Sequence, residues 1–130
     1  MSHSLIEMLR YKRPEGSVTQ REFCKRFLEP TFGRPDRHGN YVHIVGDKPN
    51  LCFTAHHDTV HKDDGMQQLI VMNDVVSVAD PKKSSCLGAD CTTGVWLMCS
   101  LCCMNVVDWG MFSLRQSRNV WIGFFENCYP

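Results

Sequence analysis

Hydrophobic positions recur at helical spacing in the first thirty residues. Residues 4–11 form the first predicted helix, and a second begins at Thr19, which stands three residues before Glu22 as in a capping box. Pro30 is expected to end this second helix. The apolar faces of the two helices consist of Leu5, Met8 and Leu9 in the first, and Phe23, Phe27 and Leu28 in the second.

The pattern then changes to short apolar runs that are typical of strands. The runs span residues 41–45, 51–55, 67–72, 75–79 and 119–125. The run at 51–55 is apolar enough to suit a central strand, and Asn73-Asp74 suits a tight turn between two others. Residues 92–104 predict a helix that is apolar on all sides and therefore buried. This order of elements predicts an α/β protein with a mixed β-sheet flanked by helices.

Composition narrows the class of protein. The 130 residues are 43% hydrophobic and 22% charged, as expected for one globular domain. Fourteen basic and fourteen acidic residues cancel, so charge favours neither a nucleic acid nor a membrane surface as partner. Residues 1–10 lack the long apolar core of a signal peptide, and we expect a cytoplasmic protein with reduced thiols. The oligomeric state is not readable from the sequence.

The candidate chemistry lies where the strand at 51–55 ends. His56, His57, Asp58 and His61 follow this strand directly, and in open α/β sheets functional groups collect at such carboxyl ends. We predict that His56 binds a metal, with Asp58 holding its far ring nitrogen. Asp90 stands before the helix at 92–104, where the helix dipole favours an anion.

Purely structural roles explain the same residues. Histidines at a strand end often only form hydrogen bonds within a loop, and an aspartate before a helix can act as its cap. For His57 and His61 we favour this structural interpretation. For His56 and Asp90, residue spacing alone leaves both interpretations open.

Two motifs in the chain add a further argument: His56-x-Asp58-x-Val60, and Gly88-Ala89-Asp90 followed by Gly94. Together, in this order, they resemble the co-catalytic zinc exopeptidases, a group that includes peptidase T, the aminoacylases and related aminopeptidases. The resemblance covers roughly residues 5–98. It implies His56 as a metal ligand, Asp58 as a catalytic support residue and Asp90 as the ligand bridging two zinc ions.

The resemblance implies a metal-dependent hydrolase that cleaves a terminal peptide or amide bond of a peptide or an N-acyl amino acid. Two zinc ions activate a water and polarise the carbonyl in such enzymes, and a glutamate serves as general base. Glu126 takes the place of that base here. Asn127 stands where the family has a ligating acid, and Cys91 replaces the acid that usually follows the bridging aspartate.

The end of the chain departs further from the family. The acid and the histidine that complete the metal sites of the family would lie beyond Pro130. We therefore expect residues 1–130 to be an N-terminal piece of one peptidase-like catalytic domain. Residues 99–130 form an atypical Cys-rich tail, for which a shifted reading frame is one hypothesis. An inactive remnant or binding module that retains the fold is therefore the main alternative function. Weaker alternatives are a redox motif at Cys99–Cys102 and a structural zinc site from Cys86, Cys91, Cys99 and Cys102.

Overall fold

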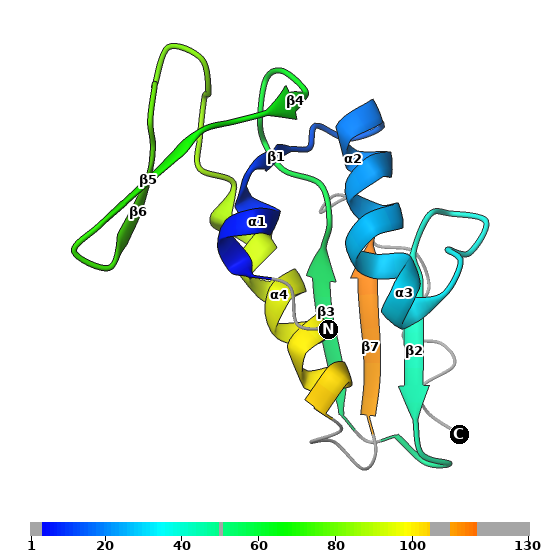
Figure 1. Ribbon diagram of the computed structural model, residues 1–130. Coiled ribbons are helices and arrows are strands. Elements are labelled where there is room, and N and C mark those ends of the chain that lie inside the picture. Colours follow the sequence, from blue (N-terminus) through cyan, green and yellow to red (C-terminus); the bar gives the residue numbers. More distant parts are fainter. Residues whose placement is uncertain (1–3, 50, 105–109, 117–130) are drawn as a thin grey trace.

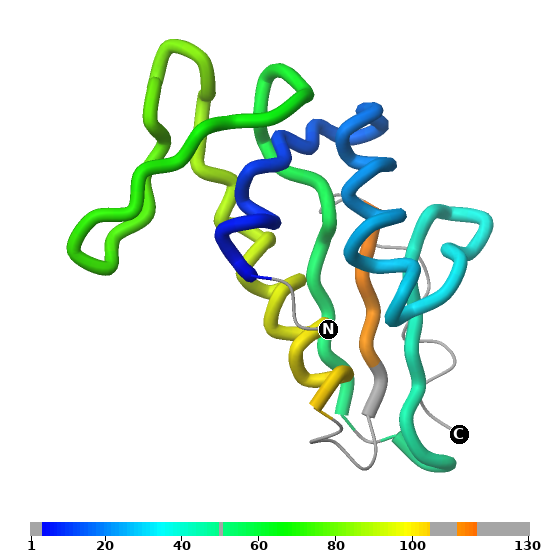
Figure 2. Tube along the Cα trace, viewed as in Figure 1, coloured from blue at the N-terminus to red at the C-terminus, as the bar shows by residue number. Residues whose placement is uncertain are grey.

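The computed structural model describes residues 4–49, 51–104 and 110–116 (Figure 1). Figure 2 traces the same path as a tube. The elements in chain order are α1 (Leu5–Leu9), β1 (Tyr11–Lys12), α2 (Val18–Phe23), a π-helical segment (Cys24–Leu28), α3 (Glu29–Phe32), β2 (Tyr41–Val45), β3 (Cys52–His56), β4 (Gly65–Met66), β5 (Leu69–Met72), β6 (Val75–Val78), α4 (Ala89–Met104) and β7 (Gly110–Arg115).

The main sheet is mixed, as predicted. Its order is β2-β7-β3, with β7 antiparallel to β2 and parallel to β3. Phe112 of β7 lies opposite His43 on one side and Phe53 on the other, and the rings of Phe53 and Phe112 stack at 5.2 Å. The prediction of a central position for the histidine strand is wrong for the described residues. Strand β7, which the sequence analysis did not predict, takes the centre and leaves β3 on the outside.

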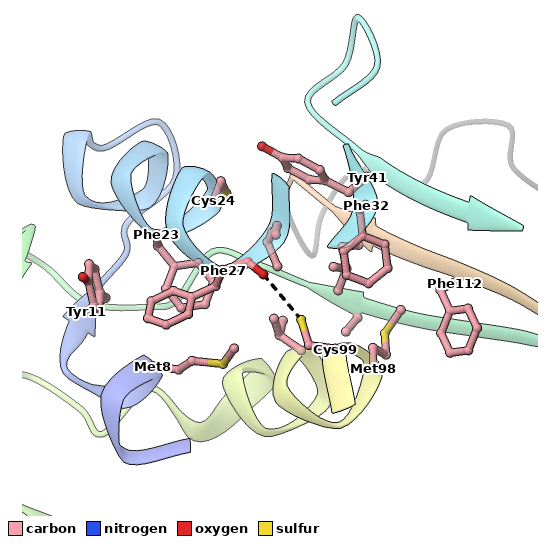
Figure 3. Packing of buried hydrophobic residues seen from close by; sticks show 14 residues of the cluster. Met8, Tyr11, Phe23, Cys24, Phe27, Phe32, Tyr41, Met98, Cys99 and Phe112 are labelled. Carbon is pink, nitrogen blue, oxygen red and sulfur yellow. Dashed lines mark hydrogen bonds between the residues drawn. The ribbon is translucent and has the colours of Figure 1, made fainter. Parts of the chain in front are cut away.

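The hydrophobic core lies on the sheet face that carries Phe112 and Leu114, both fully buried (Figure 3). Helical residues from the first half of the chain, such as Phe23 and Phe27, pack there against residues of α4 such as Met98. Burying each aromatic side chain contributes roughly 1.5–3 kcal/mol. Because α4 and β3 share this core, the start of the helix is held close to the end of the strand.

The second helix begins and ends differently from the prediction. Its N-cap is Ser17, whose Oγ accepts a hydrogen bond of 3.1 Å from the backbone N–H of Gln20. Thr19 is instead buried, and its Oγ1 accepts from the N–H of Gly65. Pro30 does not end the helical stretch, which runs on to Phe32. A π-helical turn precedes Pro30. The first turn of a helix tolerates proline, because proline lacks a backbone N–H and a residue at that position has no helical partner for one.

Helix α4 is buried on one face rather than all round. Thr92, Val95, Met98 and Cys99 are buried at helical spacing, whereas Leu97 is 48% and Met104 68% exposed. Asp90 and Cys91 have non-helical backbone angles, so regular helical geometry begins at Thr92, as predicted.

The predicted turn at Asn73-Asp74 is confirmed. Both residues have positive φ, 51° and 62°, as in the type I′ turns that form two-residue hairpin loops. The turn connects β5 to β6. The strand predicted at residues 119–125 lies outside the described residues. Among the described helices, none combines the length and apolarity needed to cross a bilayer.

Arg13 connects the elements that surround the end of β3. Its side chain is fully buried, with the guanidinium 3.9 Å from the ring centre of Phe23. Nε donates to the carbonyl of His57 at 2.8 Å, and Nη1 donates to the carbonyls of two residues near the N-terminus, Met8 and Tyr11. Nη2 donates to the hydroxyl of Thr92. Burial lowers the pKa of Arg13 to about 10, and the guanidinium remains charged at neutral pH.

We expect Arg13→Met to destabilise the fold by about 2–4 kcal/mol, because several buried carbonyls lose their donor at once. Urea denaturation monitored by tryptophan fluorescence measures this loss. Arg34→Met is the matched control, because Arg34 is exposed and its replacement is expected to change stability by less than about 0.5 kcal/mol. Equal stability of the two variants would contradict the central role of Arg13.

Candidate metal centre

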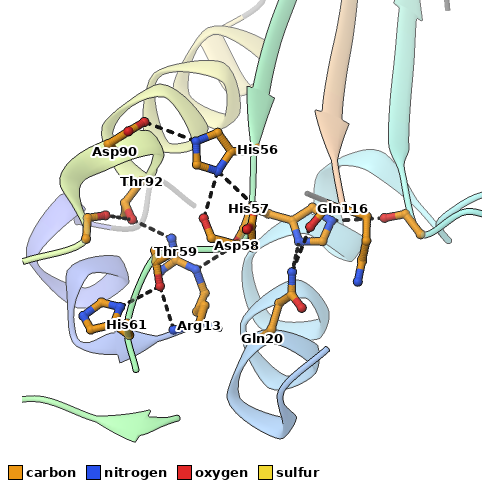
Figure 4. Close-up of polar contacts among 12 residues, drawn as sticks. Arg13, Gln20, His56, His57, Asp58, Thr59, His61, Asp90, Thr92 and Gln116 are labelled. Atoms are coloured by element: carbon orange, nitrogen blue, oxygen red, sulfur yellow. Dashed lines mark hydrogen bonds and ion pairs between the residues drawn. The ribbon is translucent and has the colours of Figure 1, made fainter. Parts of the chain in front are cut away.

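His56 is the last residue of β3, and its ring is held from behind by Asp58 (Figure 4). The Nδ1 atom lies 3.0 Å from Oδ1 of Asp58 and 2.9 Å from the backbone oxygen of the same residue. Both are acceptors, which assigns the proton of a neutral imidazole to Nδ1. The Nε2 atom is thereby left with its lone pair available to a cation.

Asp90 faces this free nitrogen from the start of α4. Its Oδ1 lies 3.2 Å from Nε2 of His56, while the aspartate side chain is 85% exposed (Figure 4). A lone pair and a carboxylate oxygen repel each other at this distance unless a proton or a metal ion lies between them. The hydrogen bond that His56 donates to the Asp58 carboxylate is the main cause that raises the pKa of His56, against the effect of burial, and Asp90 adds to the increase. The positions of Nε2 of His56 and Oδ1 of Asp90 therefore suit a proton or a metal ion between them.

Cys91 completes a group of three side chains that are able to bind a metal ion. One ligand atom from each of His56, Asp90 and Cys91 lies within 4.8 Å of the other two. Two ligand atoms about 2.1 Å from a tetrahedral ion lie roughly 3.4 Å apart, close to the 3.2 Å between His56 and Asp90. Nitrogen, oxygen and sulfur ligands of this kind suit zinc. The residues present therefore fit a zinc ion, with the Asp90 side open to solvent.

The two halves of the centre are held in place by Arg13. It binds the carbonyl of His57, the residue after His56, and the hydroxyl of Thr92, two residues after Asp90. Thr92 in turn donates to the carbonyl of Gly88. The sequence analysis missed Arg13, because it lies in a segment with loop-like composition and only the tertiary contacts reveal its burial.

Gly88, part of the second motif, is required by its surroundings. Its φ is +78°, and a Cβ there would lie 2.7 Å from Cε1 of His61. A larger residue would therefore strain the backbone and push against the buried His61. This strain would arise two residues before Asp90.

His57 and His61 have hydrogen-bond partners typical of structural residues. Nε2 of His57 donates to the carbonyl of Gly39, and Nδ1 accepts from Gln20. Burial is the main cause that lowers the pKa of His57 to about 4, so the ring is neutral. His61 is also buried, and its Nε2 donates to the carbonyl of Cys86. A cavity of about 320 Å³ borders His57 but none of the three ligating side chains.

The two cysteine-based alternatives are not supported by the geometry. Burial raises the pKa of Cys99 to about 12 and that of Cys102 to about 11, the opposite of what a redox motif requires. Among the described residues, the metal-ligating group contains Cys91 but not the other three cysteines of the proposed structural zinc site. Glu126, the predicted general base, lies outside the described residues.

No family model matches the sequence, and no curated protein matches it. Among solved structures, the fold is similar to that of a tripeptidase from Staphylococcus aureus, with a TM-score of 0.60 and 17% sequence identity. The similarity covers 85% of this chain and 33% of that chain, so this chain spans about a third of the tripeptidase's length. At this identity the likeness concerns the fold alone, and it shows that the described part of this chain has a peptidase-like fold.

Proposed function

We propose that this chain is the metal-binding part of a zinc-dependent hydrolase that cleaves a terminal peptide or amide bond. The observation that carries the proposal is the orientation of His56, which Asp58 holds through Nδ1 while Nε2 faces Asp90. A carboxylate behind a metal-ligating histidine is a common arrangement in zinc enzymes. The similarity of the fold to that of a tripeptidase supports a peptide as the substrate class, and the family resemblance adds an N-acyl amino acid.

Each residue has a distinct task in this proposal. His56 and Asp90 hold the ion, and Asp58 fixes the tautomer of His56 and increases its basicity. A bound zinc ion supplies Lewis acidity, which activates water and polarises the substrate carbonyl. The high exposure of Asp90 leaves space on that side for a substrate. Glu126 stays the predicted general base, on the strength of the family resemblance.

A binding module without catalysis is the second candidate function. Within the described residues, the structure contains one group of three or more metal-ligating side chains, whereas the resemblance implies two zinc ions. In this second candidate, the chain binds metal and substrate-like ligands without turning them over. The two candidates share the metal centre and differ in activity.

Replacing His56 tests the metal centre. We expect His56→Ala to abolish the zinc binding of this centre in isothermal titration calorimetry of the whole chain, and Asp90→Asn to weaken it, because each variant removes a ligand. His38→Ala is the matched control, since His38 is exposed and outside the centre. Unchanged zinc affinity in His56→Ala would refute the site. All three variants retain every cysteine, so zinc binding to thiols elsewhere is the same in all titrations.

The contribution of Asp58 is measurable separately. Asp58→Asn keeps the shape of the side chain but removes its charge, and loss of such an outer partner typically lowers metal affinity about 10- to 100-fold. We expect a decrease in zinc affinity within this range by the same calorimetry. Asp64→Asn, at an exposed aspartate, should leave the affinity unchanged. An equal effect of both substitutions would show that only net charge matters.

Activity distinguishes the two candidate functions. We expect the zinc-loaded chain to release the terminal residue from tripeptides or N-acyl amino acids, as measured by chromatography of the products. A chelator and the His56→Ala substitution should each reduce the rate to that of the uncatalysed control. A chain that binds zinc at His56 but releases no product would instead establish the binding module.

A further inference from the structure

Cys91 is the residue of the metal centre that the family resemblance does not assign. It follows Asp90 directly, precedes the regular part of α4 and is partly buried. Its ligand atom lies within 4.8 Å of those of His56 and Asp90, so all three side chains can approach one point. An acid is expected at this position in the family, and a thiol changes the chemistry of the site.

Gly94 gives an independent reason to assign a role to this thiol. Gly94 lies one helical turn after Cys91, and a Cβ there would be 2.7 Å from the Cys91 Sγ and 3.4 Å from the Cβ of Ala55. Glycine within a helix costs about 1 kcal/mol relative to alanine. The absence of a side chain at position 94 therefore leaves room for the sulfur between the helix and the end of β3.

We propose that the Sγ of Cys91 is the third protein ligand of a single ion held by His56 and Asp90. This inference rests on the proposed function, and it changes the expected centre from two ions bridged by Asp90 to one ion with a nitrogen, an oxygen and a sulfur ligand. Thiolate favours zinc and other thiophilic divalent ions over magnesium and calcium. The thiol proton passes to solvent when the sulfur binds the ion.

Three protein ligands leave one position of a tetrahedral ion open. This arrangement is typical of catalytic zinc sites, whereas structural sites use four protein ligands. The exposed side of Asp90 is where the open position would meet solvent or substrate. A centre of this composition would bind its ion without the ligands that the resemblance places later in the chain.

Cobalt(II) provides a direct test, because a thiolate bound to cobalt gives a charge-transfer band in the near ultraviolet. We expect this band when the whole chain is titrated with cobalt(II), and a stoichiometry of one ion at this centre. Cys91→Ser should remove the band and lower affinity for zinc at least 10-fold, since losing a ligand should cost no less than losing an outer partner. Cys86→Ser is the matched control, because Cys86 is also partly buried but outside the group.

Two further measurements extend the test, and the first is independent of variant folding. In the unmodified chain, zinc should protect Cys91 but not Cys86 from alkylation, as located by mass spectrometry. Gly94→Ala should weaken the cobalt band because the added methyl displaces the sulfur. Metal binding through His56 without a thiolate band, or with Cys91 unprotected, would overturn this inference alone. No metal binding at all would overturn the proposed metal centre together with it.

Discussion

The buried guanidinium of Arg13 is the interaction on which the rest of the structure depends. One side chain supplies hydrogen bonds to carbonyls near the N-terminus, to the end of the histidine strand and, through Thr92, to the start of α4. A buried charge is costly unless its hydrogen bonds are made, so the surrounding elements must converge on it. Burial lowers the pKa of Arg13, and nearby groups that include Asp58 act in the opposite direction and favour the charged guanidinium.

The geometry of the candidate metal centre is a consequence of this convergence. His56 comes from the end of an outer strand, and Asp90 from the start of a helix that packs on the same core. Arg13 holds the residue after His56 and the second residue after Asp90, which keeps the two ligands at a distance suited to one ion. Fixed orientation of this kind would lower the entropy cost of ordering these side chains around an ion.

The peptidase-like fold does not by itself determine the chemistry of the candidate metal centre. The fold is shared with part of a tripeptidase at low sequence identity, and a fold alone does not decide chemistry. In the proposed centre the chemistry depends on His56, Asp90 and Cys91, and in particular on a thiol where the family resemblance implies a carboxylate. A hydrolase and a metal-binding module can both be built on this scaffold.

The sequence by itself determined the features that depend on neighbouring residues. These include the mixed α/β class, the turn at Asn73-Asp74 and the choice of His56, Asp58 and Asp90 as candidate site residues. Only the tertiary structure placed β7 between β2 and β3, buried Arg13 and brought Cys91 close to His56. Local spacing encodes helices, turns and strand ends, whereas these three features arise from contacts between segments far apart in the chain, for which a single sequence contains no periodic signal.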